Sequence, residues 1–267
     1  MAFSCRLCLT LLVLILPSAV SYCLEPLPPC HPVLLAANRL TVLADDPALS
    51  SVNPVAGETG ISSATSFIYS MKSLEQFGLA SIAEYGKAGV FSNWQTLNND
   101  DYQRQDYQIG VRYKLSKLRA GIGYRFMYDK IPGYGSEKDR QLYAGARYRH
   151  KSLIIDASAQ RAYKDDPAGE NEPEIYSLVM GQEVTTNSTL AGGLVFARHS
   201  SPDLLLGCRL DLYDNLMGLV SWSNRTGRFG IGAGFRTEWL QISYALLTHP
   251  DLDLTHSVGI SILMPAR

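Results

Sequence analysis

The sequence predicts an all-β protein: a transmembrane antiparallel β-barrel of about 14 strands, within a range of about 12–14, preceded by a short N-terminal helix or hatch segment. Two observations predict this class. Runs of roughly ten residues that alternate apolar and polar side chains recur from residue 102 to residue 264, separated by turns. In addition, the chain begins with an apolar segment typical of an export signal.

The clearest run spans residues 107–115, where every odd position is apolar and every even position is polar or glycine. Because side chains alternate faces along a β-strand, such a strand has one apolar and one polar face. We therefore expect Tyr107, Ile109 and Val111 to face lipid, and Arg112 to face the barrel interior. The alternative is the solvated face of a soluble sheet, which has the same alternation.

Residues 1–21 are predicted to be a signal peptide, because a short positive start precedes an apolar stretch too short to span a bilayer as a helix. Small residues at Ala19 and Ser21 predict cleavage after Ser21. A lipoprotein with an acylated Cys23 is the alternative, and Tyr22 argues against it because a small residue is required there. No other apolar stretch is long enough for a spanning helix, so we expect the exported chain in the outer membrane of a Gram-negative bacterium.

Composition limits the classes of partner and chemistry. The chain has 267 residues and a formal net charge of -1, whereas nucleic-acid binding needs a basic surface, so no nucleic-acid partner is expected. Its 15 tyrosines suit a protein with many residues at a membrane–water interface. No cysteine or histidine spacing suggests a metal site, and no cofactor is expected. Cys23 and Cys30 can pair in an oxidising compartment, which the sequence leaves open, and Cys208 is expected to be a small buried or lipid-facing side chain.

The segment before the barrel divides into two parts. Residues 22–34 are rich in proline and are expected to form an extended arm. Residues 35–63 are expected to form an N-terminal strand, or extended stretch, and then a hatch-like segment. Asp46 before Pro47 predicts the start of a helix of one or two turns, with Asp46 as its N-cap. The Asn-Pro pair that follows is expected to end this helix.

The barrel itself is expected over residues 64–267. Turn residues predict tight connections on one rim and longer, charged connections at 129–140, 164–174 and 249–253 on the other. Longer loops are typical of the outside face of such barrels. The expected strands cover residues 65–73, 79–85, 88–96, 105–115, 118–128, 141–149, 153–163, 175–184, 189–198, 204–212, 216–222, 229–235, 240–247 and 254–264.

In these strands, apolar residues alternate with residues that are mostly polar or glycine, and these polar positions are expected to line the barrel interior. Several glycines lie at these positions, although glycine weakens a strand. Two explanations suit them: the close approach of a plug or of crowded side chains inside a narrow lumen, or curvature of the barrel wall. Charged residues of both signs share the same face and are the candidate lumen-lining residues: Arg112, Arg125, Arg147, Arg209, Asp211 and Arg236.

The stretch Ala44-Asp45-Asp46-Pro47-Ala48, followed by Asn53-Pro54-Val55-Ala56-Gly57, resembles the entry region of the PorV/PorQ family of outer-membrane barrels, which are similar to FadL-type transporters. Members of that family typically read A-D-D-P-x-A and then N-P-A-G before the first barrel strand, and here a valine is inserted in the second motif. The closing stretch 253–262 resembles the family's final strand. The chain departs from the family in its shorter length and in lacking a final aromatic residue.

The resemblance implies a segment folded into the lumen as a hatch, with Asp45, Asp46, Pro47, Asn53 and Pro54 as the candidate hatch or plug residues. It also implies passage of small hydrophobic compounds, or a role as a membrane component of type IX protein secretion. The implied partners are outer-membrane lipid and secretion components or exported proteins. The alternative is a barrel with a plugged lumen that serves only as structure or as a docking site for partners.

The sequence gives little support for an enzyme, and we expect none. A lipid hydrolase is a remote alternative, since His256 lies on the apolar parity near several serines at the expected membrane boundary. Acidic residues at 165–174 suggest a calcium-binding loop, but the ligand spacing of such loops is absent, so a charged, solvated loop is expected.

Overall fold

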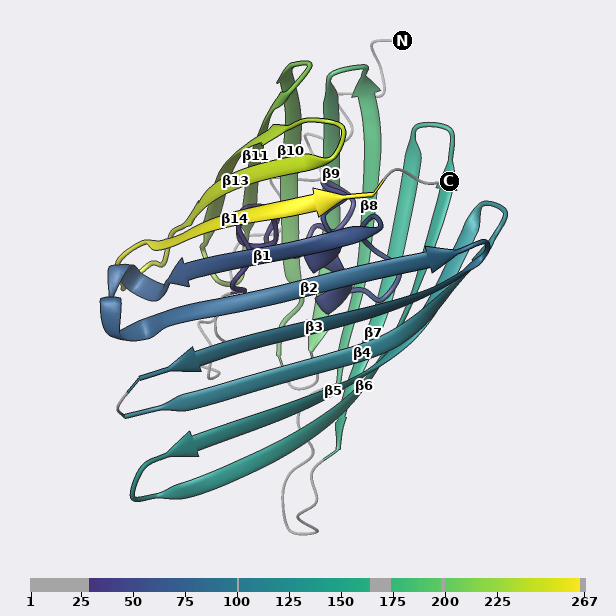
Figure 1. Ribbon diagram of the computed structural model, residues 1–267. Helices are drawn as coiled ribbons and strands as arrows, with labels where there is room; N and C mark the ends of the chain where they lie inside the picture. Colours follow the sequence, from purple (N-terminus) through teal and green to yellow (C-terminus); the bar gives the residue numbers. More distant parts are fainter. Residues whose placement is uncertain (1–28, 100, 164–173, 198–199, 265–267) are drawn as a thin grey trace.

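The computed structural model describes residues 29–99, 101–163, 174–197 and 200–264, which form a closed barrel of fourteen antiparallel strands (Figure 1). Each strand pairs with its neighbours in sequence, and the first strand closes the barrel against the last. The predicted fold class and strand number are confirmed. The signal peptide and Cys23 lie outside the described residues. The strands are β1 (Gly60–Phe67), β2 (Glu75–Tyr85), β3 (Ala88–Asn98), β4 (Gln103–Leu115), β5 (Leu118–Ile131), β6 (Gly135–His150), β7 (Leu153–Tyr163), β8 (Ile175–Thr185), β9 (Ser188–Ala197), β10 (Asp203–Tyr213), β11 (Leu216–Ser223), β12 (Phe229–Arg236), β13 (Leu240–Leu247) and β14 (Thr255–Leu263).

The alternation of the sequence becomes an apolar outer face and a more polar inner face. On β4, Ile109 and Val111 are 64% and 54% exposed on the outer surface, whereas Gln108 and Arg112 are 5% and 3% exposed. The predicted faces of this strand are therefore correct. An outer surface of this composition suits lipid, because a membrane-spanning barrel has an apolar band outside and polar side chains inside.

Connections differ between the two rims of the barrel. The tight-turn rim, where β1 begins and β14 ends, carries short turns such as those at 86–87 and 116–117. The long-loop rim includes the β1–β2 connection, which contains the 3-10 turns η2 (Ile68–Ser70) and η3 (Lys72–Leu74). The charged loop predicted at 129–140 is wrong: β5 and β6 continue their ladder as far as Ile131 and Gly135 and meet in a tight turn. Charged side chains are tolerated there because strands of such length extend past the membrane.

Strand length varies around the barrel. Strands β4, β5 and β6 have 13, 14 and 16 residues, whereas β11, β12 and β13 have 8 each. A tilted strand needs about 9–11 residues to cross the hydrocarbon core. The teal strands of Figure 1 therefore reach beyond the bilayer, while the yellow-green strands are only just long enough to cross it.

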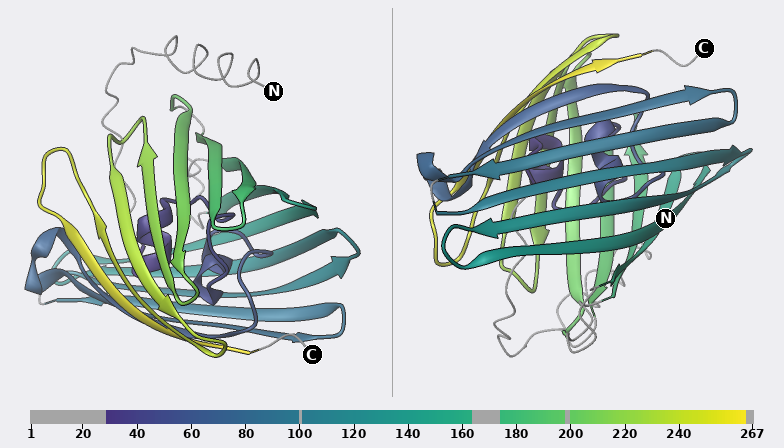
Figure 2. Two further views of the ribbon diagram at one scale, coloured as in Figure 1. Left: turned by 90° about the horizontal axis from the view of Figure 1, so that it is seen from above. Right: turned by 60° about the horizontal axis from the view of Figure 1, so that its bottom comes forward.

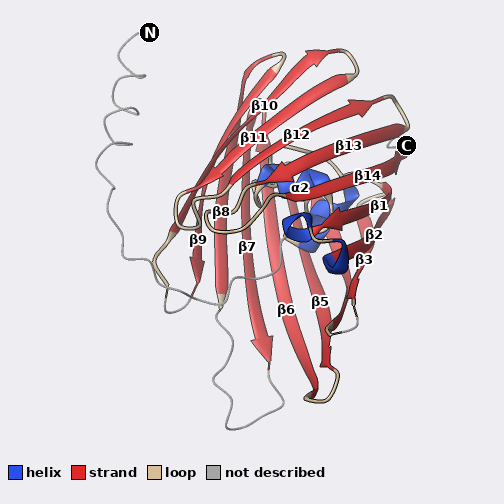
Figure 3. Ribbon diagram, turned by 90° about the vertical axis from the view of Figure 1, so that its left-hand side faces the viewer, coloured by secondary structure: helices blue, strands red, loops and turns tan. Residues whose placement is uncertain are grey.

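The N-terminal segment lies inside the barrel. Residues 30–57, here called the inner segment, contain the helix α2 (Pro32–Ala37) and the 3-10 helix η1 (Pro47–Ser51), and the strands surround both helices (Figures 2 and 3). Nearly all of its side chains are buried. Among the described residues, no helix has the length and hydropathy needed to cross a membrane.

Several predictions near the N-terminus are wrong. The end of the arm expected at 22–34 and the start of the strand expected within 35–63 form the helix α2 instead, while residues 22–28 lie outside the described part of the chain. This helix has Pro32 at its first position and is capped by His31, whose ring accepts from the Val33 amide. Its side chains are buried all round, so its apolar run lacks the period by which a helix is recognised. The barrel also begins at Gly60 rather than residue 64, and the strand expected at 65–73 ends at Phe67.

The helix predicted from Asp46 and Pro47 is present as η1, with the Asp46 carboxylate accepting from the Ala48 amide at 2.9 Å. Beyond it, Asn53 and Pro54 lie in a turn before the chain enters β1.

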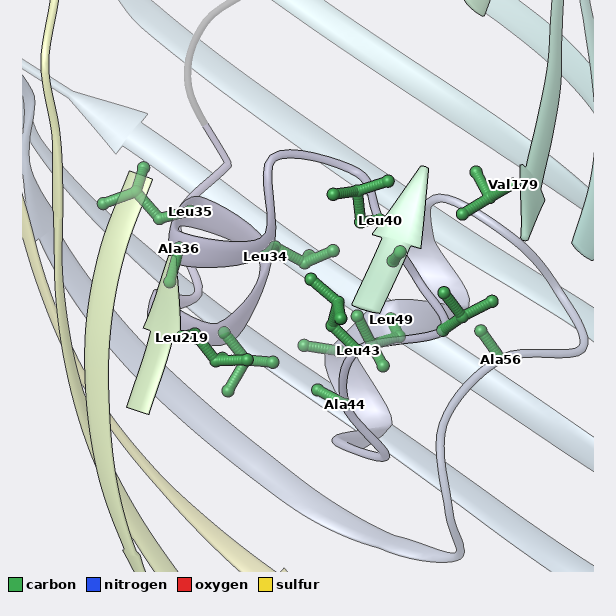
Figure 4. Close-up of a cluster of buried hydrophobic side chains, with 14 of the residues drawn as sticks. Leu34, Leu35, Ala36, Leu40, Leu43, Ala44, Leu49, Ala56, Val179 and Leu219 are labelled. Carbon is green, nitrogen blue, oxygen red and sulfur yellow. The ribbon is translucent and has the colours of Figure 1, made fainter. Parts of the chain in front are cut away.

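A hydrophobic core joins the inner segment to one side of the barrel wall. Leu34, Leu40, Leu43 and Leu49 pack together, and Figure 4 shows them between wall side chains such as Val179 of β8. Each of these leucines is at most 1% exposed. Full burial of a leucine contributes about 1.5–3 kcal/mol, so this core holds the inner segment firmly against the wall.

The orientation of β4 can be tested by introducing a charge on its outer face. The substitution Ile109→Arg should lower the free energy of unfolding by about 2–4 kcal/mol, because it places a guanidinium in hydrocarbon near the middle of the strand. The matched substitution Gln105→Arg, on the same face but nearer the long-loop rim, should cost about 0–1 kcal/mol. Denaturant titration of both variants in lipid vesicles measures the costs, and equal costs would contradict the assignment.

Candidate functional site

The barrel interior is the candidate site, because the inner segment meets a wall from which side chains are missing. A Cβ atom added to Gly145 would lie 2.0 Å from the Asn53 side-chain oxygen, and one added to Gly230 would lie 2.6 Å from the Ala36 carbonyl oxygen. Glycine therefore leaves the space through which the inner segment passes. Of the glycines on the inner parity, Gly121, Gly145, Gly230, Gly232 and Gly259 face the inner segment, whereas Gly110, Gly123 and Gly234 face crowded wall side chains.

On the β4–β5 side, the wall binds the inner segment through arginines. The Arg112 guanidinium donates at 3.0 Å to each of the carbonyl oxygens of Ala56 and Gly57, and it lies 2.6 Å from the Glu84 carboxylate. Arg119 donates to the Val55 carbonyl at 3.1 Å. Irregular backbone at membrane depth needs partners for its carbonyl groups, and these arginines supply them.

A buried ion pair anchors the middle of the inner segment. Arg147 of β6 and Asp156 of β7 stand opposite each other in the ladder and form two bonds of 2.7 Å. Thr41 of the inner segment joins both, because its hydroxyl donates to Asp156 at 2.6 Å and its carbonyl accepts from Arg147 at 2.9 Å. Both carboxylate oxygens of Asp156, and the Nε and Nη2 atoms of Arg147, therefore have partners, as a buried charge requires.

The other candidate lumen residues lie at different heights in the barrel. Arg209 lies 3.8 Å from the Asp45 carboxylate and 3.0 Å from Asp211, near the tight-turn rim. At the same rim, Arg236 pairs with Glu58 at 2.9 Å. Arg112, Arg147, Arg209 and Arg236 thus contact the segment from residue 41 to residue 58, whereas Arg125 pairs with Asp106 of the wall.

Asp46 is the centre of a second polar cluster on the β13–β14 side. Besides capping η1, its carboxylate accepts from Ser261 at 2.5 Å and from Gln241 at 3.4 Å. His31 lies beside it, with Nε2 at 3.5 Å from the carboxylate and in hydrogen-bond contact with Ser62. This cluster ties both helices of the inner segment to the strands that close the barrel.

The remaining hatch candidates are Asn53, Pro54, Asp45 and Pro47. The Asn53 side-chain oxygen accepts from the Val55 amide at 3.3 Å, and Pro54 packs against Gly145. The Asp45 carbonyl accepts from the Glu58 amide at 2.7 Å, which folds the end of the inner segment back towards its middle. Pro47 is buried as the first residue of η1.

The charged or titratable residues of this site that sequence reasoning missed include His31, Glu84 and Arg119. The signal for His31 was local, because a capping side chain before proline is the same pattern that identified Asp46. Glu84 and Arg119 lie on inward parity near Arg112, but only the register of β2, β4 and β5 brings their charges together.

The hydrolase alternative rests on His256, which faces outward at the long-loop rim. Its Nε2 lies 3.1 Å from the Ser70 hydroxyl, and its Nδ1 lies 2.8 Å from the Tyr244 hydroxyl. Ser70, however, donates to the Leu254 carbonyl at 3.0 Å, and a tyrosine takes the place in which an orienting carboxylate is expected. Within the described ranges, no cluster of three or more metal-ligating side chains occurs, and the acidic loop at 164–173 lies outside them.

The cysteines have separate environments. Cys30 is buried and its thiol lies 3.4 Å from the Ala64 carbonyl oxygen, while Cys208 lies on the outer parity of β10. Both are free, and a pairing of Cys30 with Cys23 concerns a residue outside the described part of the chain.

No known family model and no curated protein matches this sequence. Among solved structures, the chain is similar to a KdgM porin, with a TM-score of 0.47 and 10% identity over 77% of this chain and 99% of the porin. A triple mutant of the Rh. blastica porin gives a TM-score of 0.44 and 9% identity, over 77% and 98% of the two chains. These similarities do not identify a family, and the function is argued from the geometry of the interior.

The ion pair of β6 and β7 predicts a large difference between two arginines of one strand. Arg147→Met should lower the free energy of unfolding by about 3–5 kcal/mol, because it leaves the Asp156 carboxylate buried without a counter-ion. Arg149→Met, which removes an exposed pair with Glu183, should cost about 0–1 kcal/mol. Denaturant titration in the same detergent compares the two, and a cost below 1 kcal/mol for Arg147→Met would show that the pair is not buried in solution.

His31 predicts a pH dependence of stability. Burial lowers the pKa of His31 below its ordinary value, and the charge of Asp46 opposes this only in part. The folded state therefore holds a neutral ring, and stability is lost as the pH falls through the unfolded pKa of about 6.5, because only the unfolded chain then gains the proton. The variant His31→Asn keeps a capping acceptor but cannot titrate.

Unfolding midpoints measured between pH 8 and pH 5 at constant ionic strength should fall more steeply for the wild-type protein than for His31→Asn. The greatest contribution from one histidine is about 1.4 kcal/mol per pH unit. Parallel curves would mean that His31 is protonated equally in both states.

Proposed function

We propose that this protein is an outer-membrane β-barrel that passes small solutes through a pore closed at rest by its own residues 30–57. The location follows from the predicted export signal and from the apolar outer face, which a soluble protein would not expose over a whole barrel. Exposed aromatic side chains at the tight-turn rim, including Tyr85, Tyr213 and Trp239, suit a membrane–water interface.

The observation that carries the proposal is the unequal attachment of the inner segment to its two walls. Its leucines pack against β7–β11 and β13, where separation exposes apolar surface to water. On the β4–β7 side, the carbonyl groups of residues 52–57 accept hydrogen bonds from Gln160, Arg119 and Arg112, and only Ala56 and Val52 of this stretch also contact the hydrophobic core. Water can replace such bonds at a net cost of about 0.5–1.5 kcal/mol for the neutral donor Gln160 and about 1.5–3 kcal/mol for each charged arginine donor. A passage therefore opens most readily along the β4–β7 wall.

The candidate hatch residues fit this role. Asn53 and Pro54 lie on the polar side that water can enter, while Asp45 and Asp46 hold the segment at the tight-turn end. The resemblance of residues 44–57 to the PorV/PorQ and FadL-related barrels supports a hatch and suggests small hydrophobic compounds as the solutes.

A second candidate is a permanently plugged barrel that serves as a membrane component of protein secretion of the type IX kind, or as a docking site. Close packing at the start of the inner segment favours it, since the cavity beside Cys30 and His31 holds only about 10 Å³. The two candidates differ in whether the inner segment moves.

A single disulfide can lock the inner segment. A Cβ atom at residue 78 would lie 3.4 Å from that of Cys30, close to the typical separation in a disulfide of about 3.5–4.5 Å. In a Cys23→Ser background, Gly78→Cys should form this bond on oxidation, and the segment would then be fixed at both ends, by the bond and by its continuation into β1. Cys208 lies on the outer face and cannot compete.

In planar bilayers, the oxidised Gly78→Cys protein should conduct less than the same protein after reduction, because the bond holds residue 30 on β2 and limits how far the inner segment can move inside the barrel. Gly78→Ser is the matched control and should not respond to reductant. Conductance that is identical in both redox states would reject movement of the segment, and absence of conductance in every variant would favour the second candidate.

A further inference from the structure

One arginine of the inner segment, Arg39, has no carboxylate within ion-pair distance among the described residues. Arg39 follows α2 and is partly exposed, and among the described residues no group lies within hydrogen-bond or ion-pair distance of its guanidinium. The amide nitrogen of the Asn38 side chain is buried and likewise has no partner in the described structure. Two neighbouring donors are therefore left open, which is costly unless something binds them.

The backbone that presents these donors is strained. Asn38 has φ 46° and Arg39 has φ 71°, both in the left-handed region. Asparagine tolerates this region and often ends a helix there, whereas an arginine in it is uncommon. Such strain persists where the surrounding structure imposes it, and it is found most often at functional sites.

Other positive groups gather around Arg39. Its electrostatic neighbours are Arg125 of β5, Arg225 and Arg228 of the β11–β12 connection, and one carboxylate, Asp203. That carboxylate is engaged elsewhere, because both of its oxygens accept from the Ser223 hydroxyl at 2.8 Å and one accepts from the Arg225 amide at 3.0 Å.

The balance of charge is positive even when the wall pairs are included. Among the described residues, the guanidinium groups of Arg39, Arg125 and Arg225 face two carboxylates, those of Asp203 and of Asp106, the partner of Arg125. Burial lowers the pKa of Arg39, and the positive charge of Arg125 lowers it further. A site of this kind attracts anions, and the paired N–H groups of an arginine guanidinium can donate to two oxygens of a carboxylate, sulfate or phosphate.

We propose that Asn38 and Arg39, with Arg125 and Arg225, form a binding site for the oxyanion group of a solute at the long-loop end of the inner segment. Arg225 lies in the connection at the long-loop rim, and its exposed side chain can meet the solute first. The site goes beyond the proposed pore, because it assigns a charge to the solute. Binding does not require that the pore opens.

The test uses full-length protein in neutral detergent and inorganic phosphate as the probe. Isothermal titration at constant ionic strength, with chloride replaced by phosphate, should give saturable binding at about one site per chain. Arg39→Gln should weaken this binding at least tenfold. Asn38→Gly keeps a residue suited to the left-handed conformation and removes only the amide, so it should weaken binding by a smaller factor. Arg149→Gln, at the opposite rim, is the matched control and should leave binding unchanged.

Sulfate and succinate in separate titrations show which oxyanion is preferred, and heat-modifiable migration in gels shows that each variant is folded. Equal binding by wild type and folded Arg39→Gln, or binding that does not saturate, would overturn the proposal. Saturable phosphate binding without conductance in the Gly78→Cys experiment would retain the anion site while rejecting the pore, so the two proposals fail separately.

Discussion

The structure depends on the close packing of the inner segment against those positions of the barrel wall where glycine leaves no side chain. A barrel of fourteen strands encloses more room than wall side chains alone would fill, but those side chains would collide with the inner segment where it approaches the strands closely. Glycines at 145, 230, 232 and 259 remove the conflict where Asn53, α2 and its preceding residues approach the strands. Replacement of these glycines by larger residues would displace the inner segment before it disturbed the strand ladder.

The same fit explains why the interior carries so many charges. Backbone that is neither helix nor strand leaves carbonyl groups without partners, and lipid offers none. The wall supplies donors at the positions that need them, as Arg112 does for Ala56 and Gly57. The arginines that neighbour their own carboxylates, such as Arg147 with Asp156, keep their charge balanced while they bind the segment. Arg39 departs from this pattern, because no described residue forms an ion pair with it.

Much of the barrel could be predicted because a strand between lipid and a polar interior alternates apolar and polar side chains along its sequence. The strand expected at 105–115 is observed as Gln103–Leu115, and its inward residues follow directly from parity. The inner segment could not be predicted in this way. Its surroundings are protein on all sides, so α2 has no polar face and its sequence has no period.

Capping signals gave the start of η1 at Pro47, and the same signal at His31 was obscured by the prolines around it. Contacts such as that of Arg119 with the Val55 carbonyl were beyond prediction, since one partner is backbone that every residue possesses.

The closure of β1 against β14 sets an order on assembly. These strands pair Gly60 with Leu263, so the contact that completes the wall joins positions about two hundred residues apart and is costly in chain entropy. The inner segment precedes β1 in the chain and is synthesised before any strand. It must lie within the curved sheet before the last strand docks, because afterwards fully closed walls leave only the two rims as entrances. Residues 30–57 are thus available as a surface against which the strands that carry inward glycines can pack as the sheet curves. Without this segment, the closing barrel would enclose water in its place.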